Sequence, residues 1–435
     1  MNPSPASVLA CERMPDSLRD TCRHVASAAS EVGVQAYLVG GLVRDLLLGR
    51  PTSADVDIAI EGPNRAFSTA LAARLGGVAR SDSQFLTNRI DLPDGGHIDV
   101  ASARQEAYAA PANLPTVESA SIGDDLRRRD FSVNAMALHL ALREPYDLVD
   151  PCGGADDLHR GRLRVLHDRS FTDDPTRIIR AARLAARLGF VIEPQTRTGM
   201  RLAVDADMLR LVTGSRIRAE VAKLLEEPDP SQAVRHLDEI GAMTQAMPGA
   251  CSGPHSLRWL QQTPVALAAL GIAGTRARPQ AWPYLLGAVC AQGRPTACAD
   301  RLTLDRRARD IVLSMGDARP TDLTQQLASR ERLDDARLDA CLHAARPGHM
   351  VRLWLGGGPV LRRRLERYNS VVQGTQADVT GHDLADAGIP AGPAVRIGLQ
   401  GARRAKLAGQ TQVDMQLRAA VRAIRRWQRP GAVGR

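Results

Sequence analysis

Apolar positions near the N-terminus recur at helical spacing and then give way to short β-branched runs. Residues 16–35 carry apolar side chains three and four residues apart, which predicts an amphipathic helix. Short strands are predicted at 37–39, 56–60, 98–101 and 163–166, separated by helical stretches such as 65–75. This alternation predicts a mixed α/β domain up to about residue 165.

Strand patterns nearly vanish after residue 165. The rest of the chain predicts successive helices rich in Arg, Ala and Leu, with no repeat period. Proline and glycine interrupt them at 193–194, 228–230, 248–249, 356–359 and 390–393. The second half is therefore expected to be all-α.

The charge balance is basic and carried almost wholly by arginine. Lys and Arg total 57 against 48 for Asp and Glu, and Lys223 and Lys406 are the two lysines. Guanidinium binds phosphate in a bidentate manner, so the excess favours a polyanionic partner such as nucleic acid or nucleotide. An Arg-rich genome would give the same composition without any such partner.

The sequence does not indicate a membrane-spanning protein or a disulfide-rich protein. The longest apolar stretch falls well short of the roughly 18 residues that a spanning helix needs, and the N-terminus lacks a leader pattern. The seven cysteines form no C-x-x-C pair, so neither a disulfide framework nor a structural zinc site is expected. We expect a cytoplasmic protein.

The first candidate chemical motif is Gly40-Gly41-Leu42-Val43-Arg44-Asp45, between the 37–39 strand and a short helix that ends near Gly49. Glycine lets a backbone approach a phosphate closely, and the helix N-terminus favours an anion. Arg44, one turn into the helix, is expected to contact a triphosphate. A glycine pair after a strand is also common as a purely structural turn.

A second motif places Asp55 and Asp57 at the start of the 56–60 strand. Residues i and i+2 of a strand point to the same side, so both carboxylates can hold two hard cations for phosphoryl or nucleotidyl transfer. Asp99 stands in another apolar strand and is a candidate third catalytic carboxylate. A solvated loop for the pair, and strand-edge solubility for Asp99, are the alternatives.

A charged segment, Asp125-Leu126-Arg127-Arg128-Arg129-Asp130, precedes Asn134 and a predicted apolar helix over 135–142. The arginines could form a solvated face. Asn134 offers a capping side chain or a ribose contact. We favour phosphate and sugar contacts for Arg129, Asp130 and Asn134.

The helix predicted after Phe171-Thr172-Asp173 has a cationic face. Asp174 fits the N-cap position and Pro175 the first helical position. At about 100° per residue, four arginines fall within about 120° of arc, opposite an apolar face; they are Arg177, Arg180, Arg183 and Arg187. An ordinary amphipathic helix with a capping aspartate would show the same pattern.

In order and spacing, these segments resemble the class II tRNA nucleotidyltransferase and bacterial poly(A) polymerase family of the DNA polymerase β superfamily. The matching segments are GGLVRD, ADVDIAIEG, IDVASARQEAY, DLRRRDFSVNAMA and DPCGGADDLHRGRLRVLHDRSFTDDPTRIIRAARLAARLGF. The resemblance covers residues 36 to about 230 and is weaker beyond. It implies an α+β fold: a polymerase-β-like palm over 1–165, a helical neck over 166–230, and a helical body and tail over 231–435 that bind RNA.

The resemblance also implies roles for single residues. Gly41 and Arg44 match nucleotide-phosphate contacts, Asp55 and Asp57 match magnesium ligands, and Arg129 with Asn134 matches triphosphate and sugar contacts. The element that selects and holds the incoming nucleotide is matched by Asp174, Arg177, Arg180 and Arg183. A carboxylate at Asp174 can accept from the exocyclic amine of C or A while Arg177 donates to the adjacent ring acceptor; G and U present the opposite pattern.

The implied function is Mg²⁺-dependent addition of C and A, from CTP and ATP, to the 3′ end of tRNA without a nucleic-acid template. The metal pair would lower the pKa of the RNA 3′-hydroxyl and neutralise the departing pyrophosphate. The Arg-dense stretches 362–367 and 403–426 fit phosphate contacts to an acceptor stem.

Full CCA, CC-only, A-only and poly(A) members share every motif quoted, so these alternatives stay open. The absence of a long basic extension favours tRNA over messenger tails. A nucleotidyltransferase acting on a small molecule would leave the Arg-rich helical half unused. A non-catalytic RNA-binding relative is expected to lack a carboxylate, whereas Asp55 and Asp57 are both present. The sequence gives no indication of oligomeric state.

Overall fold

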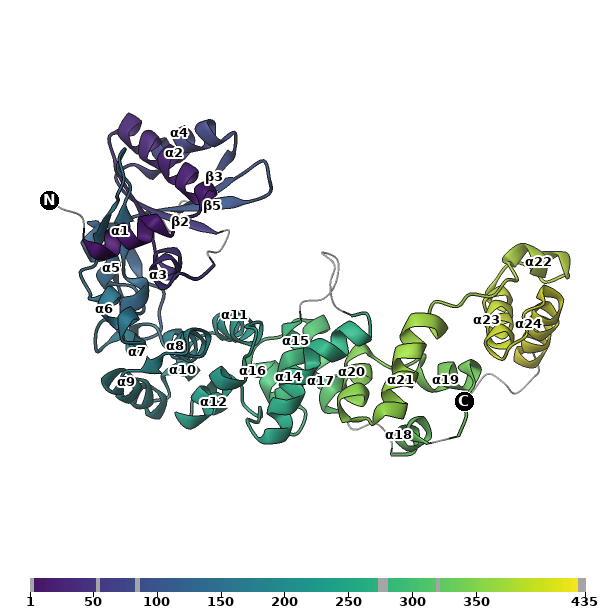
Figure 1. Ribbon diagram of the computed structural model, residues 1–435. Helices are drawn as coiled ribbons and strands as arrows, with labels where there is room; N and C mark the ends of the chain where they lie inside the picture. The colour runs from purple at the N-terminus through teal and green to yellow at the C-terminus, as the bar shows by residue number, and fades with distance from the viewer. Residues whose placement is uncertain are drawn as a thin grey trace. The chain divides into compact units, whose positions relative to one another are not determined.

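The computed structural model describes residues 4–51, 55–82, 87–272, 281–317, 321–329 and 331–428. The chain forms two compact units, Met1–Ala246 and Met247–Arg435 (Figure 1). The finer division after residues 165 and 230 stays a prediction. Among the described helices, none combines the length and apolar character needed to cross a membrane.

A seven-stranded mixed sheet forms the centre of the first unit. In spatial order its strands are β3 (Val78–Asp82), β4 (Thr87–Asp91), β5 (His97–Ser102), β2 (Val56–Glu61), β1 (Gln35–Val39), β8 (Ala137–His139) and β9 (Asp147–Val149). Neighbouring strands run antiparallel except β2 and β5, which are parallel. Their register sets Asp57 opposite Asp99. Directly paired residues share a face of the sheet, so these two carboxylates lie on the same side.

Two helices, α2 (Asp16–Val32) and α4 (Asn64–Leu75), pack side by side against the sheet (Figure 1). Their inward faces bury the apolar residues that the helical spacing predicted, including Cys22 and Val25 of α2 and Phe67 and Leu71 of α4. The helix predicted over 16–35 ends at Val32, because Gly33 takes a left-handed conformation and β1 then begins. A shorter helix, α1 (Pro5–Glu12), precedes them.

One predicted helix is wrong. Residues 135–142 form no helix: a 3₁₀ turn, η1 (Ser132–Asn134), leads directly into strand β8. A short apolar run suits a buried strand as well as a helix. Pairing with β1 satisfies the backbone groups on both strands while Met136, Ala137 and Leu138 become fully buried.

The strand predicted over 163–166 is mostly wrong. Only Arg162–Leu163 forms a strand, β10, and it pairs in parallel with β11 (Val191–Ile192) outside the main sheet. The ladder is limited by its partner, because β11 is two residues long and ends where a proline begins α9 (Pro194–Asp205). Val165 adds one isolated bridge to Phe131.

The other elements of the first unit are helices and one hairpin. The hairpin pairs β6 (Arg104–Ala107) with β7 (Thr116–Ser119). The short α3 (Gly41–Leu48) follows β1 and ends at Gly49, as predicted. The helices not yet placed are α5 (Ile122–Arg127), α6 (Gly154–His159), α7 (Ser170–Asp173), α8 (Thr176–Leu188), α10 (Met208–Leu211), α11 (Gly214–Leu225), α12 (Ser231–Glu239) and α13 (Met243–Ala246).

The described part of the second unit is helical, as predicted. Its elements are α14 (Pro254–Ala269), α15 (Trp282–Cys290), α16 (Pro295–Arg301), α17 (Arg306–Gly316), α18 (Thr321–Ala328), α19 (Asp335–Leu342), α20 (Pro347–Gly356), α21 (Pro359–Arg367), η2 (Tyr368–Val372), α22 (Gly381–Asp386), α23 (Pro393–Leu407) and α24 (Val413–Trp427). The predicted proline and glycine breaks all fall between helices or at their ends.

The two lysines are both held by carboxylates, one in each unit. Lys223 of α11 lies 3.2 Å from Glu220, and Lys406 of α23 lies 2.5 Å from Asp378. The remaining positive charge of the side chains at neutral pH is therefore arginine.

Candidate active site

A cavity of about 560 Å³ in the first unit brings together most of the predicted nucleotide-binding residues. The predicted residues in its lining are Gly40, Gly41, Asp57, Arg129, Asp130, Asn134, Asp174, Arg177 and Arg180. The sheet, α3 and η1 supply one wall, and α8 supplies another. The lining also includes residues that the motifs did not single out for the site: Arg104, Glu106, Tyr108, Leu114, Pro115, Thr176, Arg216, Ala219 and Glu220.

The glycine pair lets charged side chains approach the turn between β1 and α3. Gly40 has φ 77° and ψ −137°, a conformation that favours glycine. A Cβ on Gly40 would lie 3.1 Å from Arg129 Nη1, and one on Gly41 would lie 3.3 Å from Arg44 Nη2. The near neighbours of this turn are guanidinium groups, and the predicted approach of its backbone to a phosphate stays a prediction.

Two of the predicted carboxylates, Asp57 and Asp99, lie in the paired strands β2 and β5, and Asp55 directly precedes β2. Burial raises the pKa of Asp57, and the like charges of Asp99 and Asp55 raise it further, while Arg129 acts in the opposite direction. Arg89 donates to both oxygens of Asp99, at 2.9 and 3.1 Å. His97 Nε2 lies 3.6 Å from Asp55 Oδ1 and 3.7 Å from Asp99 Oδ2.

The carboxylates of Asp55, Asp57 and Asp99 have the chemistry of metal ligands, although they do not form a preformed cluster. No group of three or more His, Cys, Asp or Glu side chains in the described ranges is placed to hold a metal ion. Carboxylate oxygens are the ligands that hard divalent cations prefer, and a cation would relieve the repulsion that raises the pKa of Asp57. The residues therefore fit such an ion.

Arg44 and Asp45 are drawn away from the cavity lining. Both are buried, and Arg44 donates to the two oxygens of Asp45 at 2.9 and 2.8 Å. Its third contact is with Asn134 Oδ1 at 2.7 Å. Arg183 also lies outside the lining, 3.3 Å from Glu227. In this structure both arginines therefore bond to side chains outside the cavity lining or at its edge, and so support the elements that line it.

Asp130, just before η1, and Arg180 of α8 form a partly buried ion pair. The carboxylate accepts from Arg180 Nε at 3.0 Å and from Arg180 Nη2, and also from Asn134 and the backbone of Phe131. Burial acts to raise the pKa of Asp130, but the charge and hydrogen bonds of Arg180 outweigh it and the pKa is lowered. Asp130 raises the pKa of Arg180 in turn.

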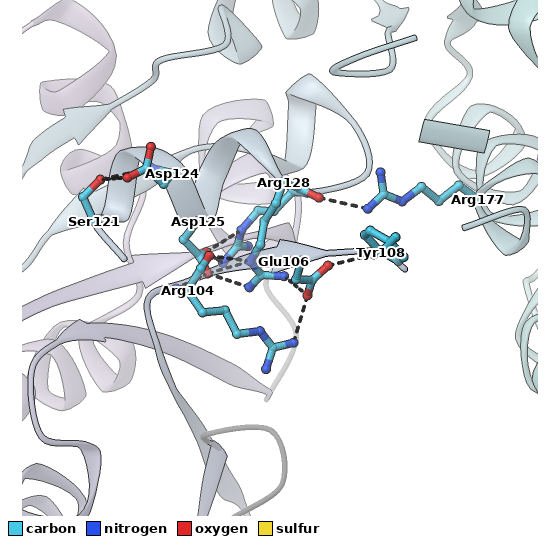
Figure 2. Close-up of polar contacts among 9 residues, drawn as sticks. Arg104, Glu106, Tyr108, Ser121, Asp124, Asp125, Arg128 and Arg177 are labelled. Carbon is cyan, nitrogen blue, oxygen red and sulfur yellow. Dashed lines mark hydrogen bonds and ion pairs between the residues drawn. The ribbon is translucent and has the colours of Figure 1, made fainter. Parts of the chain in front are cut away.

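The β6–β7 hairpin contributes a network that the sequence analysis missed. Glu106 accepts from Arg104 at 3.2 Å, Arg128 at 2.6 Å and the hydroxyl of Tyr108 at 2.8 Å (Figure 2). Arg128 also donates to Asp125, while its carbonyl accepts from Arg177 at 2.9 Å. Arg128 is therefore not part of a solvated face. The R-x-E-x-Y spacing was the available signal, because alternate strand residues share one side.

The start of α8 positions Asp174 and Arg177. Helix α8 begins at Thr176, one residue later than predicted, with Pro175 rather than Asp174 at its N-cap. The Asp174 carboxylate still accepts from Thr176 N at 3.1 Å, a bond of the predicted capping kind. Arg177 is buried and donates to Ser170 Oγ at 2.5 Å as well as to the Arg128 carbonyl. The cationic face becomes more exposed along the helix, and the side chain of Arg187 is 43% exposed.

Comparisons with known proteins identify the family. The poly A polymerase head domain matches residues 36–164, and the probable RNA and SrmB-binding site of polymerase A matches residues 189–252. The A-adding tRNA nucleotidyltransferase of Halalkalibacterium halodurans is 31% identical over 384 residues, which cover 84% of this chain and 83% of that protein. The chain belongs to the tRNA nucleotidyltransferase family. This confirms the resemblance seen in the motifs, and a nucleotidyltransferase of this kind generally uses a divalent metal ion.

Further relatives support the assignment. The A-adding tRNA nucleotidyltransferase of Geobacter sulfurreducens is 32% identical over 92% of this chain, although the match spans only 46% of that longer protein. Among solved structures, a CCA-adding enzyme in apo form II has a TM-score of 0.78 at 28% identity, covering 96% of this chain and 98% of its own. The Thermotoga maritima CCA-adding enzyme complexed with tRNA has a TM-score of 0.72 at 26% identity, with coverage of 96% and 98%. The α+β fold class is confirmed, and the roles of single residues stay predictions.

Proposed function

We propose that this nucleotidyltransferase adds C and/or A, from CTP and ATP, to the 3′ end of tRNA without a nucleic-acid template. The observation that carries the proposal is the shared cavity. Gly40, Gly41 and Asp57 line one part of it, while Asp174 and Arg177 line another. A single nucleoside triphosphate would thus meet phosphate-binding backbone, a metal-ligand carboxylate and base-reading side chains.

In the proposed reaction the 3′-oxygen of the RNA forms a bond to the α-phosphorus of the nucleotide, and the bond to the departing pyrophosphate breaks. Asp55 and Asp57 would hold Mg²⁺, which supplies charge neutralisation and acidifies the attacking hydroxyl. The backbone at Gly40 and Gly41, with Arg129, would orient the triphosphate. Asp99, held by Arg89, is kept as the candidate third carboxylate.

Base selection would come from Asp174 and Arg177. The carboxylate accepts from the exocyclic amine of C or A, and the guanidinium donates to the neighbouring ring nitrogen. Two of the five N–H groups of Arg177 are committed to Ser170 and to the Arg128 carbonyl, which leaves three for a ligand. Arg180 and Arg183 would support α8 and the triphosphate.

The second unit would supply RNA contacts through exposed arginines. Several arginines in the dense stretches are used internally, since Arg362 stacks over Trp354 and Arg403 binds Asp339. The exposed ones are Arg363, Arg367, Arg404, Arg418, Arg422, Arg425 and Arg426, and Arg367 also pairs with Asp335. Contacts of this kind bind phosphate and weaken as salt increases. A cytoplasmic location is proposed because tRNA and nucleoside triphosphates are found there.

A-only addition is the second candidate. Two relatives that match over more than four-fifths of this chain, from Geobacter sulfurreducens and Halalkalibacterium halodurans, are A-adding enzymes. The shared motifs alone do not separate this activity from complete CCA addition.

The deciding experiment supplies purified protein and Mg²⁺ with tRNA transcripts that lack CCA, end in C, or end in CC. Labelled CTP and ATP are given separately and together. Sequential addition to all three transcripts supports complete CCA synthesis, and addition of A to the CC end alone supports the A-only candidate. Long tails on generic RNA, with no action on tRNA, would overturn both in favour of poly(A) synthesis.

A further inference from the structure

Asp174 is held through only one of its two carboxylate oxygens. Oδ1 accepts three hydrogen bonds, from Thr176 N at 3.1 Å, Thr176 Oγ1 at 2.6 Å and Arg216 Nη2 at 3.0 Å. No described residue donates a hydrogen bond to Oδ2. Since Asp174 lines the cavity, Oδ2 is the oxygen left for a ligand.

Arg216 of α11 makes a second contact besides the one with Asp174. Its Nη1 donates to the carbonyl of Ala112 at 2.7 Å, in the loop that joins β6 and β7. The amide of Ala112 donates to the carbonyl of Thr172 at 3.1 Å. The planar guanidinium thus links α11, the Asp174 carboxylate and the hairpin loop that carries Tyr108 and Leu114 into the cavity lining. A lysine has one compact donor group and cannot reproduce this fork.

We propose that Arg216 and Thr176 are positioning residues that set nucleotide selection by committing Oδ1 of Asp174. This inference rests on the proposed function and adds residues that the motif analysis did not assign. The terminal torsion of an aspartate is soft, so an unrestrained carboxylate can turn or shift toward solvent. Held as it is, Asp174 presents one negatively charged acceptor to the base. The amines of A and C satisfy that acceptor, whereas the carbonyls of G and U place oxygen against oxygen.

The test uses Arg216→Met, which keeps length and loses charge, and Arg216→Lys, which keeps charge and loses the fork. Single-nucleotide incorporation into tRNA is measured with ATP against GTP and CTP against UTP. Loss of a hydrogen bond to a charged group is worth about tenfold, so we expect the selection ratio of Arg216→Met to fall by roughly that factor. Binding of the triphosphate should change less than about threefold, because other residues contact the phosphates.

Thr176 gives a finer comparison. Thr176→Val removes the hydroxyl donor and keeps the backbone N–H, so a smaller loss of selection is expected, and Thr176→Ser should restore it. Arg210→Met is the matched control, because Arg210 lies in α10 with an exposed side chain paired to Asp207. Thermal unfolding of every variant separates selection from a loss of folding.

Equilibrium binding of the four nucleotides without RNA provides a second readout. If the wild-type protein transfers no nucleotide to tRNA, the proposed function fails, and the binding ratios alone decide the positioning role. A variant that unfolds more readily but keeps the wild-type selection ratio overturns the inference. So does a loss of selection that is equally large in Arg210→Met.

Discussion

The ion pair between Asp130 and Arg180 is predicted to stabilise the first unit strongly. Asp130→Asn keeps the size of the side chain but removes its charge, leaving Arg180 with Glu220 at 3.6 Å as its remaining carboxylate. Breaking a buried pair typically costs about 3–5 kcal/mol. The Arg180 side chain is 32% exposed, so we expect about 2 kcal/mol here, after allowing for solvent and for Glu220.

The assay is chemical denaturation followed by two signals. All four tryptophans lie in the second unit, at 259, 282, 354 and 427, so their fluorescence reports on that unit. Hydrogen exchange in α8 reports on the first unit. A double-mutant cycle with Arg180→Met should give a coupling energy of at least about 1 kcal/mol. A loss below about 0.5 kcal/mol for Asp130→Asn, or additive behaviour in the cycle, would refute the reasoning.

The pH dependence follows from the lowered pKa of Asp130. A carboxyl whose pKa is lower in the folded state stabilises the protein above its unfolded pKa of about 3.9. That contribution is lost as the pH falls through the lower folded value. The stability difference between wild type and Asp130→Asn should therefore be constant near neutral pH and shrink in acid. A difference that grows below pH 4 would contradict the assigned direction.

Three further outcomes are expected. Asp57→Ala should fold and bind nucleotide but lose nearly all Mg²⁺-dependent incorporation; near wild-type activity would refute the metal assignment. Gly40→Ala should lower stability by about 1–3 kcal/mol, because alanine is strained at this positive φ and its Cβ meets Arg129; unchanged thermal unfolding and ATP binding would contradict this. Burial raises the pKa of Cys22 to about 12, so native protein should protect this thiol from alkylation at pH 8, and mass spectrometry should find it labelled readily only after unfolding.

The parts of the site that could be predicted are those carried by local pattern. Gly40 and Gly41 follow a short strand, and Asp55 and Asp57 stand at the start of another, as the local pattern predicted. The antiparallel pairing of β1 with β2, which the pattern does not show, then brings them to the same edge of the sheet. The hydrogen bond between Asp174 and the first turn of α8 could also be predicted from an aspartate before a proline, although the helix begins one residue later than predicted.

Partners distant in sequence could not be predicted. Asp130 and Arg180 are 50 residues apart, and Asp174 and Arg216 are 42 apart, so nothing local links their charges. Asp130 lines the cavity and stays a predicted nucleotide contact, but its bond to Arg180 of α8 could not be read from local sequence. The wrong helix over 135–142 has a related cause, because only pairing with β1, about a hundred residues earlier in the chain, decides that this apolar run is a strand.

Because the chain has only two lysines, the relative motion of its two units can be followed by selective labelling. Lys223 lies in α11 of the first unit and Lys406 in α23 of the second, and each is the single lysine of its unit. Once the α-amine of the chain's first residue is blocked, amine-directed dyes would therefore mark one side chain per unit without any engineered cysteine. Energy transfer between the two labels could follow the separation of the units as nucleotide and RNA are added in turn.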